Sequence, residues 1–175
     1  MKKICLLILF ISLAGVLTNC NSTDDEPLVV QFSVEEIRRN ANFYWFNSEY
    51  NAYKIDSAIL DSIRIFFDSN TQKVAIYCSP GCECGSVYAY FPQFVKVLDS
   101  AEISNYEIFV VISYEENLGK LEHPYSYLFN LASVPSIYLL HSDGTYCELV
   151  LRATEKKMSI EEAFLDALKF LQGSN

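Results

Sequence analysis

The sequence has few basic residues and no cluster of them. Its 13 lysines and arginines stand against 22 aspartates and glutamates, which gives a formal net charge of −9. Binding of nucleic acid needs clustered positive charges that displace counterions from phosphates, so this composition excludes a nucleic-acid partner. Internal repeats are also absent, and no low-complexity tract follows the acidic N-terminal segment. A chain of this kind is expected to fold as one domain with its own core.

No apolar run is long enough to cross a bilayer, because a membrane-spanning helix needs about 20 residues. The apolar run at residues 4–17 is shorter and follows a basic start, so it predicts a signal peptide over residues 1–19. The run ends in the letters LTNC, which resemble a bacterial lipobox. This resemblance implies that Cys20 is lipidated and becomes the first residue of the mature chain. Two lysines leave with the signal, so the mature chain carries a formal charge of −11.

The segment after Cys20, NSTDDEP, is polar and too poor in apolar groups to pack, so residues 20–31 are expected to form a solvated tether. An acidic run at this place also resembles the surface-export signal of some Gram-negative envelope lipoproteins, with a plain spacer as the alternative. We therefore expect a lipid anchor at the outer membrane of the cell envelope, on its periplasmic or surface face. Paired thiols rest there as disulfides unless a reductant acts on them, because the envelope is oxidising.

Few cysteines remain for chemistry once the signal peptide is removed and Cys20 is lipidated. The four that remain are Cys78, Cys82, Cys84 and Cys147. The first three follow a predicted buried strand at residues 73–77, and the SPGC sequence at 79–82 is typical of a type II turn, which brings Cys78 and Cys82 face to face. The cluster predicts redox or metal chemistry, with a structural disulfide or three small buried hydrophobes as the alternative. Cys147 is expected to be a small buried hydrophobe.

Helix signals dominate residues 32–72, which we interpret as an N-terminal helical extension. Ser33 and Glu36 form a capping box, so a helix is expected from Ser33 to about residue 46. Residues 47–53 are expected to break it. Asp56 is typical of an N-cap, and the apolar residues after it repeat at helical spacing, which predicts a second helix.

The rest of the chain, residues 73–172, alternates strand and helix patterns. Strands are expected at residues 73–77, 106–112 and 136–140, and helices at 85–99, 123–131 and from 159 onward. Pro92 falls inside the first of these helices, where a proline removes a hydrogen bond and kinks the axis. Residues 142–144 predict a hairpin turn, with residues 145–152 as the antiparallel return strand. The order is β-α-β-α-β-β-α, and its strand-helix-strand crossover demands a parallel pair.

This order and one motif resemble the thioredoxin-like superfamily. Residues 129–136, FNLASVPS, match the family segment aromatic-Gly-Ile-x-Gly-Ile-Pro-Thr, and Pro135 takes the place of its cis proline. The resemblance covers roughly residues 73–171 and, with the lipid anchor, points to TlpA-like envelope thiol oxidoreductases. It implies an α/β, thioredoxin-like fold (β-α-β-α-β-β-α) with an N-terminal helical extension. It also implies that the bond between Val134 and Pro135 is cis and faces the cysteines.

The resemblance implies thiol-disulfide exchange without a cofactor, on the thiols or disulfides of an exported partner protein. Cys82 falls at the family's nucleophile position when counted from the strand, and Cys84 does when counted from Pro92. Either would attack, another of the three clustered cysteines would resolve, and Pro135 would shape the substrate groove. Family members place a C-x-x-C pair at a helix N-terminus, which lowers the thiol pKa. This chain lacks C-x-x-C, the tryptophan before the nucleophile and the buried strand aspartate.

Metal binding is the first alternative. The C-x3-C spacing of Cys78 and Cys82 also resembles Sco-type copper chaperones, which add a distant histidine, and thiolates with imidazole suit Cu(I) or Zn. The sequence offers two histidines. His123 is expected at the same sheet edge as the cysteines, as a ligand or as a capping or surface residue. His141 is expected in a hairpin turn that points away from the cysteines, in contact with solvent.

A redox-inactive interaction module is the second alternative, and it depends on the aromatic residues. The chain holds 12 tyrosines and the aromatic run NFYWF at residues 42–46. These side chains are expected to cover the core where the N-terminal helices pack, or else to line a peptide groove beside Pro135.

Overall fold

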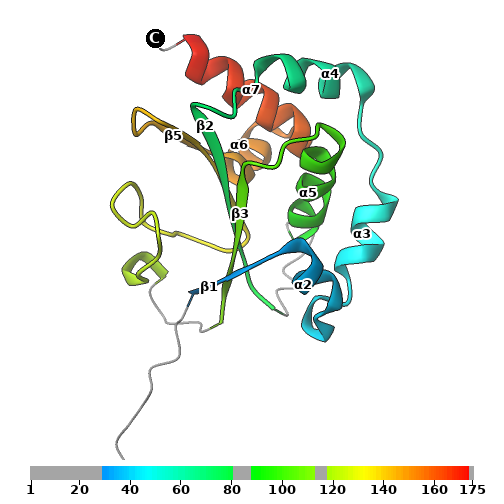
Figure 1. Ribbon diagram of the computed structural model, residues 1–175, viewed down its shortest axis with the longest axis vertical. Helices are drawn as coiled ribbons and strands as arrows, with labels where there is room; N and C mark the ends of the chain where they lie inside the picture. Colours follow the sequence, from blue (N-terminus) through cyan, green and yellow to red (C-terminus); the bar gives the residue numbers. More distant parts are fainter. Residues whose placement is uncertain (1–28, 81–87, 113–117, 174–175) are drawn as a thin grey trace, which may run out of the picture.

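The computed structural model describes residues 29–80, 88–112 and 118–173. They form a mixed α/β fold in which helices pack on one face of a five-stranded sheet (Figure 1). The strands are β1 (Val29–Phe32), β2 (Gln72–Cys78), β3 (Tyr106–Val111), β4 (Ser136–His141) and β5 (Tyr146–Glu148). The helices are α2 (Val34–Arg39), α3 (Phe46–Ala52), α4 (Ser57–Phe66), α5 (Tyr90–Ser100), α6 (Leu149–Lys156) and α7 (Ile160–Gly173), with short 3-10 helices η1 (Ala41–Phe43) and η3 (Leu118–Lys120). The predicted α/β class is confirmed.

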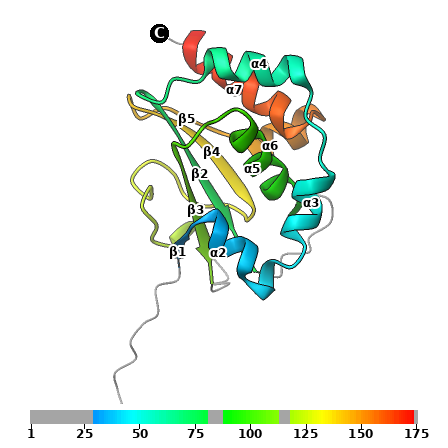
Figure 2. The ribbon, with the colours of Figure 1, turned by 45° about the vertical axis from the view of Figure 1, so that its right-hand side comes forward.

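The sheet has the strand order β1-β3-β2-β4-β5. β2 and β3 run parallel, as the predicted crossover requires. β4 runs antiparallel to β2 and to β5. β4 and β5 form the predicted hairpin around Gly144, whose φ of +90° is a conformation that glycine adopts without steric cost. In Figure 2, α5, α6 and α7 lie together on one side of these strands.

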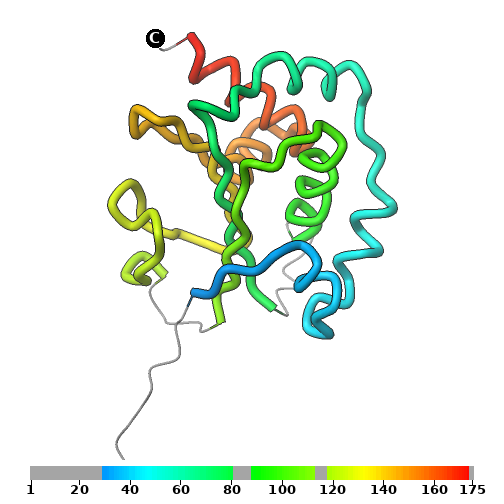
Figure 3. The backbone as a smooth tube through the Cα atoms, in the orientation of Figure 1, coloured from blue at the N-terminus to red at the C-terminus, as the bar shows by residue number. Residues whose placement is uncertain are grey.

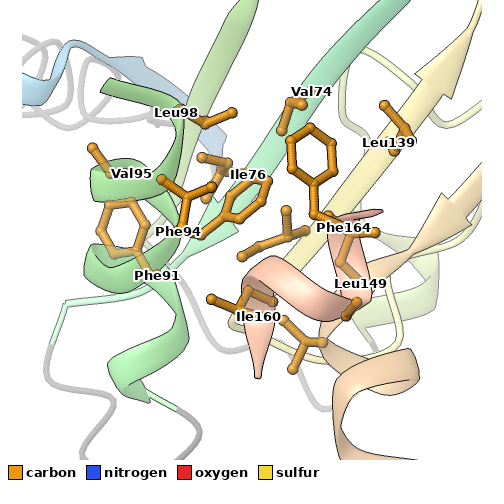
Figure 4. Close-up of a cluster of buried hydrophobic side chains, with 14 of the residues drawn as sticks. Val74, Ile76, Phe91, Phe94, Val95, Leu98, Leu139, Leu149, Ile160 and Phe164 are labelled. Atoms are coloured by element: carbon orange, nitrogen blue, oxygen red, sulfur yellow. The ribbon is translucent and has the colours of Figure 1, made fainter. Parts of the chain in front are cut away.

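Alternate residues of the strands fill two separate cores. The even-numbered residues of β2 from Val74 to Cys78 face the helices, and the odd-numbered ones face the other side. On the helix side, α5 and α7 pack against the sheet, and Phe94 meets Phe164 edge-on with ring centroids 5.0 Å apart (Figure 4). The buried residues of α7 recur every three to four positions, so one stripe of this helix faces the core.

The N-terminal extension begins with the predicted capping box. The Ser33 hydroxyl accepts a hydrogen bond from the N–H of Glu36 at 3.2 Å, and the Glu36 carboxylate accepts one from the N–H of Ser33 at 2.7 Å. The expected helix to residue 46 is wrong, because α2 ends at Arg39. Asn40 adopts an extended conformation there, and its side chain accepts a hydrogen bond from the N–H of Asn42 to cap η1.

The expected break at residues 47–53 is also wrong, because α3 occupies most of it. Phe46 is fully buried, and its ring lies 5.1 Å from that of Phe91 in α5, so tertiary packing holds this turn of helix in place. α4 follows with Asp56 as its N-cap, as predicted. It lies beside the C-terminal helix α7 (Figure 3), where the Gln172 side chain donates to the carbonyl oxygen of Phe66 at 2.9 Å.

Residues 29–31, which the sequence analysis placed in the tether, belong to β1. This strand pairs antiparallel with β3, with Val29 opposite Val111 and Phe32 opposite Ile108. Val29 packs against the core on the helix-free face, and Phe32 packs against the core on the helix side. A four-residue strand gives too short a pattern to stand out in the sequence.

The expected helix at residues 123–131 is wrong, and turns take its place. The Ser126 hydroxyl accepts a hydrogen bond from the N–H of His123 at 2.7 Å and donates one to its carbonyl oxygen at 2.8 Å. Such local side-chain bonds compete with helical ones. The segment 118–135 lies on the face of the sheet away from the helices (Figure 1).

The expected return strand over residues 145–152 is too long, because β5 ends at Glu148. The Glu148 carboxylate accepts hydrogen bonds from the N–H groups of Val150 and Leu151 and so caps α6, a helix that the sequence analysis missed. α5 begins at Tyr90, later than expected. Pro92 therefore lies in its first turn, where an N–H has no helical partner, so the predicted interior kink is wrong.

Candidate functional site

The candidate site lies at the end of the sheet where β2 ends and β4 begins. Tyr77 is paired with Ser136 across these antiparallel strands, so Cys78 and Pro135 are the next residues on each. The Val134–Pro135 peptide bond is cis, as predicted. The structure therefore brings together the first cysteine of the cluster and the proline of the motif.

Cys78 belongs to the core at this end of the sheet. It is 2% exposed, and its side chain lies in the helix-side core with Ile76. The next residue, Ser79, is buried as well, and Pro80 is half-buried. Reactive cysteines are at least partly exposed, so Cys78 in this arrangement is not open to a disulfide on another protein.

The other two clustered cysteines, Cys82 and Cys84, lie outside the described residues, as does the end of the predicted SPGC turn. α5 begins at Tyr90, six residues after Cys84. The effect of a helix dipole falls off within the first turn. No clustered cysteine lies in the first turn of α5, which is the position that the resemblance gives to the reactive pair.

His123 is buried on the face of the sheet opposite to that of Cys78. It is 9% exposed, its ring packs edge-on against Tyr77, and it lies 5.1 Å from the ring of Phe129. Its Nδ1 accepts a hydrogen bond from the phenol of Tyr77 at 2.8 Å and one from the N–H of Tyr125 at 3.3 Å. The expectation of a capping or surface residue is therefore wrong.

The structure does not bring Cys78 and His123 together as metal ligands. Burial lowers the pKa of His123, and the nearby backbone of Phe129 partly opposes this effect. The imidazole is thus neutral, as a ligand must be, but the thiol of Cys78 faces the other core. Within the described part of the chain, no three side chains of His, Cys, Asp or Glu group together to hold a metal ion.

His141 and Cys147 lie away from the candidate site. His141 is more enclosed than expected: its side chain is 14% exposed, and Nδ1 lies 2.9 Å from the carboxylate of Asp143 in the hairpin. Hydrogen bonds from Thr145, and then from His141, lower the pKa of Asp143 to about 2. Cys147 is buried in the helix-side core as predicted, and burial raises the pKa of its thiol.

A polar network that was not predicted from the sequence lies on the helix-free face. Glu107 of β3 accepts a hydrogen bond from the phenol of Tyr125 at 2.6 Å and pairs with Lys73 of β2 at 3.0 Å. The rings of Phe129 and Tyr138 stack beside it, with centroids 3.8 Å apart. One sequence feature could have indicated this network: each of two apolar runs has a charged residue near its start. These runs were predicted to form neighbouring strands.

The aromatic set of the N-terminal extension mostly covers the core, as expected. Phe43, Trp45 and Phe46 are buried, and the ring of Tyr88 meets that of Trp45 edge-on at 5.2 Å. Tyr44 is an exception, with 69% of its area exposed. The rings of Trp45 and Phe46 also contact that of Phe91, so the aromatic set fixes the extension to α5.

Comparison with known proteins gives no relative: no family model, no curated protein and no solved structure matches this chain. Over residues 29–80, 88–112 and 118–173, no helix has the length and apolar character needed to cross a membrane.

Proposed function

We propose that this chain is a lipid-anchored, thioredoxin-like domain that exchanges thiols and disulfides with an exported partner protein. The observation that carries the proposal is the meeting of Cys78, at the end of β2, with Pro135, which directly precedes β4. Two sequence features 57 positions apart, the cysteine cluster and the proline motif, thus lie at the same end of the sheet.

The order of the elements supports a thioredoxin-like topology. β2, α5 and β3 supply a strand-helix-strand unit with parallel strands, and β4, β5 and α7 supply the hairpin and the final helix in that order. Two features depart from the expected pattern: α6 precedes α7, and the segment between β3 and β4 has no α-helix in its described part. Neither departure alters the pairing of β2 with β4 that places Cys78 beside Pro135.

Burial assigns the roles of the cysteines. Cys78 is buried, so the attacking thiol of the proposal is Cys82 or Cys84. Cys147 is excluded as the resolving partner of Cys78, because it lies level with Val74 through β4. Val74 and Cys78 are four positions apart, which is roughly 13 Å along a strand. A disulfide requires Cα atoms about 4.4–6.8 Å apart, so Cys147 cannot pair with Cys78, and the proposal takes the resolving thiol from the cluster itself.

The exchange balances without a cofactor. The attacking thiolate forms a bond to one sulfur of the partner's disulfide, and the other sulfur leaves as a thiolate. A second cysteine of the cluster loses its proton to water, attacks the mixed disulfide and releases the partner's remaining sulfur. The two electrons that reduce the partner come from two thiolates, which end as a disulfide in this protein. The reverse sequence oxidises a partner dithiol.

Attachment through Cys20 would set where the exchange takes place. β1 begins at Val29, and nine residues span at most roughly 30 Å when extended. The start of β1 would therefore lie within that distance of the outer membrane. Exported proteins reach this compartment, which is oxidising and so supplies partners with disulfides.

The test is dithiol exchange by the mature chain in detergent, followed as the reduction of a fluorescent peptide disulfide. The double change Cys82→Ser, Cys84→Ser should abolish the reaction. Cys147→Ser is the matched control and should react like the wild type, because this cysteine lies away from the edge. Absence of exchange by the reduced wild type, or full activity in the double variant, would refute the proposal.

The same series identifies the resolving thiol. A variant that keeps the attacking cysteine but lacks the resolving one should accumulate a mixed disulfide with the peptide, because nothing displaces it. Mass spectrometry of the single variants of Cys78, Cys82 and Cys84 detects this adduct. If a single cysteine resolves the mixed disulfide, we expect the adduct in only one of these three single variants.

A further inference from the structure

A hollow lies at the end of the sheet far from Cys78. It has a volume of about 320 Å³ and is formed by the turn before β2, the start of β2, the segment 125–128 and the β4–β5 hairpin. At this end Gln72 is paired with His141, six residues along β2 from Cys78. Small-molecule sites in proteins measure about 300 to 1,000 Å³, so the hollow has room for one small ligand.

Hydrogen bonds fix the walls of this hollow. The side-chain amide of Asn105 donates to the carbonyl oxygens of Ser69 at 3.1 Å and Gln72 at 2.6 Å, which holds the turn before β2. On the opposite wall, the phenol of Tyr125 donates to Glu107 at 2.6 Å. A site that is already ordered loses little conformational entropy when a ligand binds.

The ionisable groups around the hollow already have partners. Lys73 pairs with Glu107 at 3.0 Å, and His141 pairs with Asp143 at 2.9 Å. The nearby carboxylate of Asp68 accepts hydrogen bonds from residues 70 and 71 of the same turn. An ion of either sign would therefore have to compete with bonds that the protein makes to itself, and the site favours a neutral ligand.

We propose that this hollow binds a neutral saccharide ring. The rings of Tyr125 and Tyr127 lie 6.4 Å apart on one wall, and Tyr127 is 77% exposed. Asn70, Thr71 and Ser142 add polar groups to the other walls. The Asn70 amide and the Thr71 hydroxyl already donate to Asp68, so these two residues offer a ligand their oxygens as acceptors. A sugar ring has C–H faces that pack on aromatic rings and hydroxyls that bond to such groups, so it matches both parts of the lining.

Two other classes of ligand match the hollow less well. An apolar compound would desolvate the amide and hydroxyl groups without giving them hydrogen bonds, which costs free energy. An extended peptide gains its affinity by adding to the edge of a sheet, and both β2 and β4 have neighbouring strands on each side.

The experiment is binding of the full mature chain, in detergent, to an array of immobilised neutral and acidic oligosaccharides. Titration calorimetry with the best neutral saccharide then gives the affinity. Tyr127→Ala should weaken binding about tenfold or more, because it removes the exposed stacking ring, whereas Tyr127→Phe keeps the ring and should stay within about threefold. Tyr44→Ala is the matched control: Tyr44 is also exposed but lies outside the hollow, and its loss should leave the affinity unchanged.

Three results would overturn the inference: no neutral saccharide binds, acidic saccharides alone bind, or Tyr127→Ala binds like the wild type. Circular dichroism of each variant checks that the fold is intact, which is expected because Tyr127 is largely exposed. The double change Cys82→Ser, Cys84→Ser should leave saccharide binding unchanged. The saccharide site and the thiol exchange can therefore fail independently of each other.

Discussion

The phenolic oxygen of Tyr77 lies 2.8 Å from Nδ1 of His123, inside the core on the helix-free face of the sheet. The N–H of Tyr125 reaches the same nitrogen at 3.3 Å. A ring nitrogen that accepts hydrogen bonds carries no proton, so Tyr77 donates and the neutral imidazole holds its proton on Nε2. This bond joins the end of β2 to the segment that leads to Pro135, and it therefore supports both halves of the candidate site.

Removal of this hydrogen bond should destabilise the protein without creating a cavity in the core. Tyr77→Phe keeps the buried ring but deletes the donor to His123, and a hydrogen bond of this kind contributes about 0.5–1.5 kcal/mol. We expect the free energy of unfolding to fall by that amount in urea denaturation. Tyr106→Phe is the control, because the phenol of Tyr106 reaches Asp99 at 3.5 Å and should matter less. Equal effects of the two changes would contradict this role for Tyr77.

The stability of the protein should depend on pH through His123. Burial lowers the pKa of this side chain below its usual 6.5, so below pH 6.5 the unfolded chain binds more protons there than the folded protein does. The contribution of His123 to stability is therefore present above pH 6.5 and lost as the pH falls through the lowered pKa. Tyr77 and Tyr125, which face the ring, stay neutral over this range because burial raises their pKa values.

Urea denaturation at pH 7 and pH 5 tests this dependence. The wild type should lose more stability between the two pH values than His123→Phe, in which nothing at this position titrates. The comparison between the two proteins cancels the titration of groups elsewhere in the chain. Equal losses in both would show that His123 is not a buried neutral imidazole.

Loss of the Glu148 carboxylate should destabilise the protein where β5 and α6 meet β4. Its carboxylate accepts hydrogen bonds from the N–H groups of Val150 and Leu151, which open α6, and from that of Ile137 in β4 at 3.3 Å. Glu148→Ala leaves these donors without an acceptor, so the free energy of unfolding should fall by about 1–3 kcal/mol in urea denaturation. Glu155→Ala changes an exposed residue of the same helix, and a loss as small as that of this control would contradict the capping role.

The parts of the fold that the sequence predicts well are those set by nearby residues. The capping box at Ser33, the N-cap at Asp56 and the hairpin at Gly144 each depend on contacts within a few positions, and each is present. The errors concern elements set by distant contacts. α3 depends on the packing of Phe46 against Phe91, and β1 depends on pairing with β3, so neither could be read from local patterns.

The candidate site divides in the same way. The approach of Cys78 to Pro135 was predictable, because a strand that ends in a cysteine and a strand that begins after a proline were both recognised, and the resemblance made them neighbours. The position of His123 was not. It depends on which face of the sheet the segment 118–135 covers, and that choice is fixed by contacts of its aromatic side chains with Tyr77 and Tyr138.

The proposed lipid anchor gives the last prediction. Cys20→Ala removes the acceptor of the lipid, so the variant should remain as unprocessed precursor and should take up no label when cells are grown with radioactive palmitate. One acyl chain gives only marginal membrane binding, whereas the lipidated cysteine of a lipoprotein carries several. The wild type should therefore stay in the membrane fraction, and the variant should not be lipid-anchored. Ser22→Ala, two residues beyond the lipobox-like letters, is the control and should be processed and labelled normally. If Cys20→Ala is processed and labelled like the wild type, the lipoprotein interpretation is wrong, and the apolar run at residues 4–17 belongs to an ordinary secretory signal.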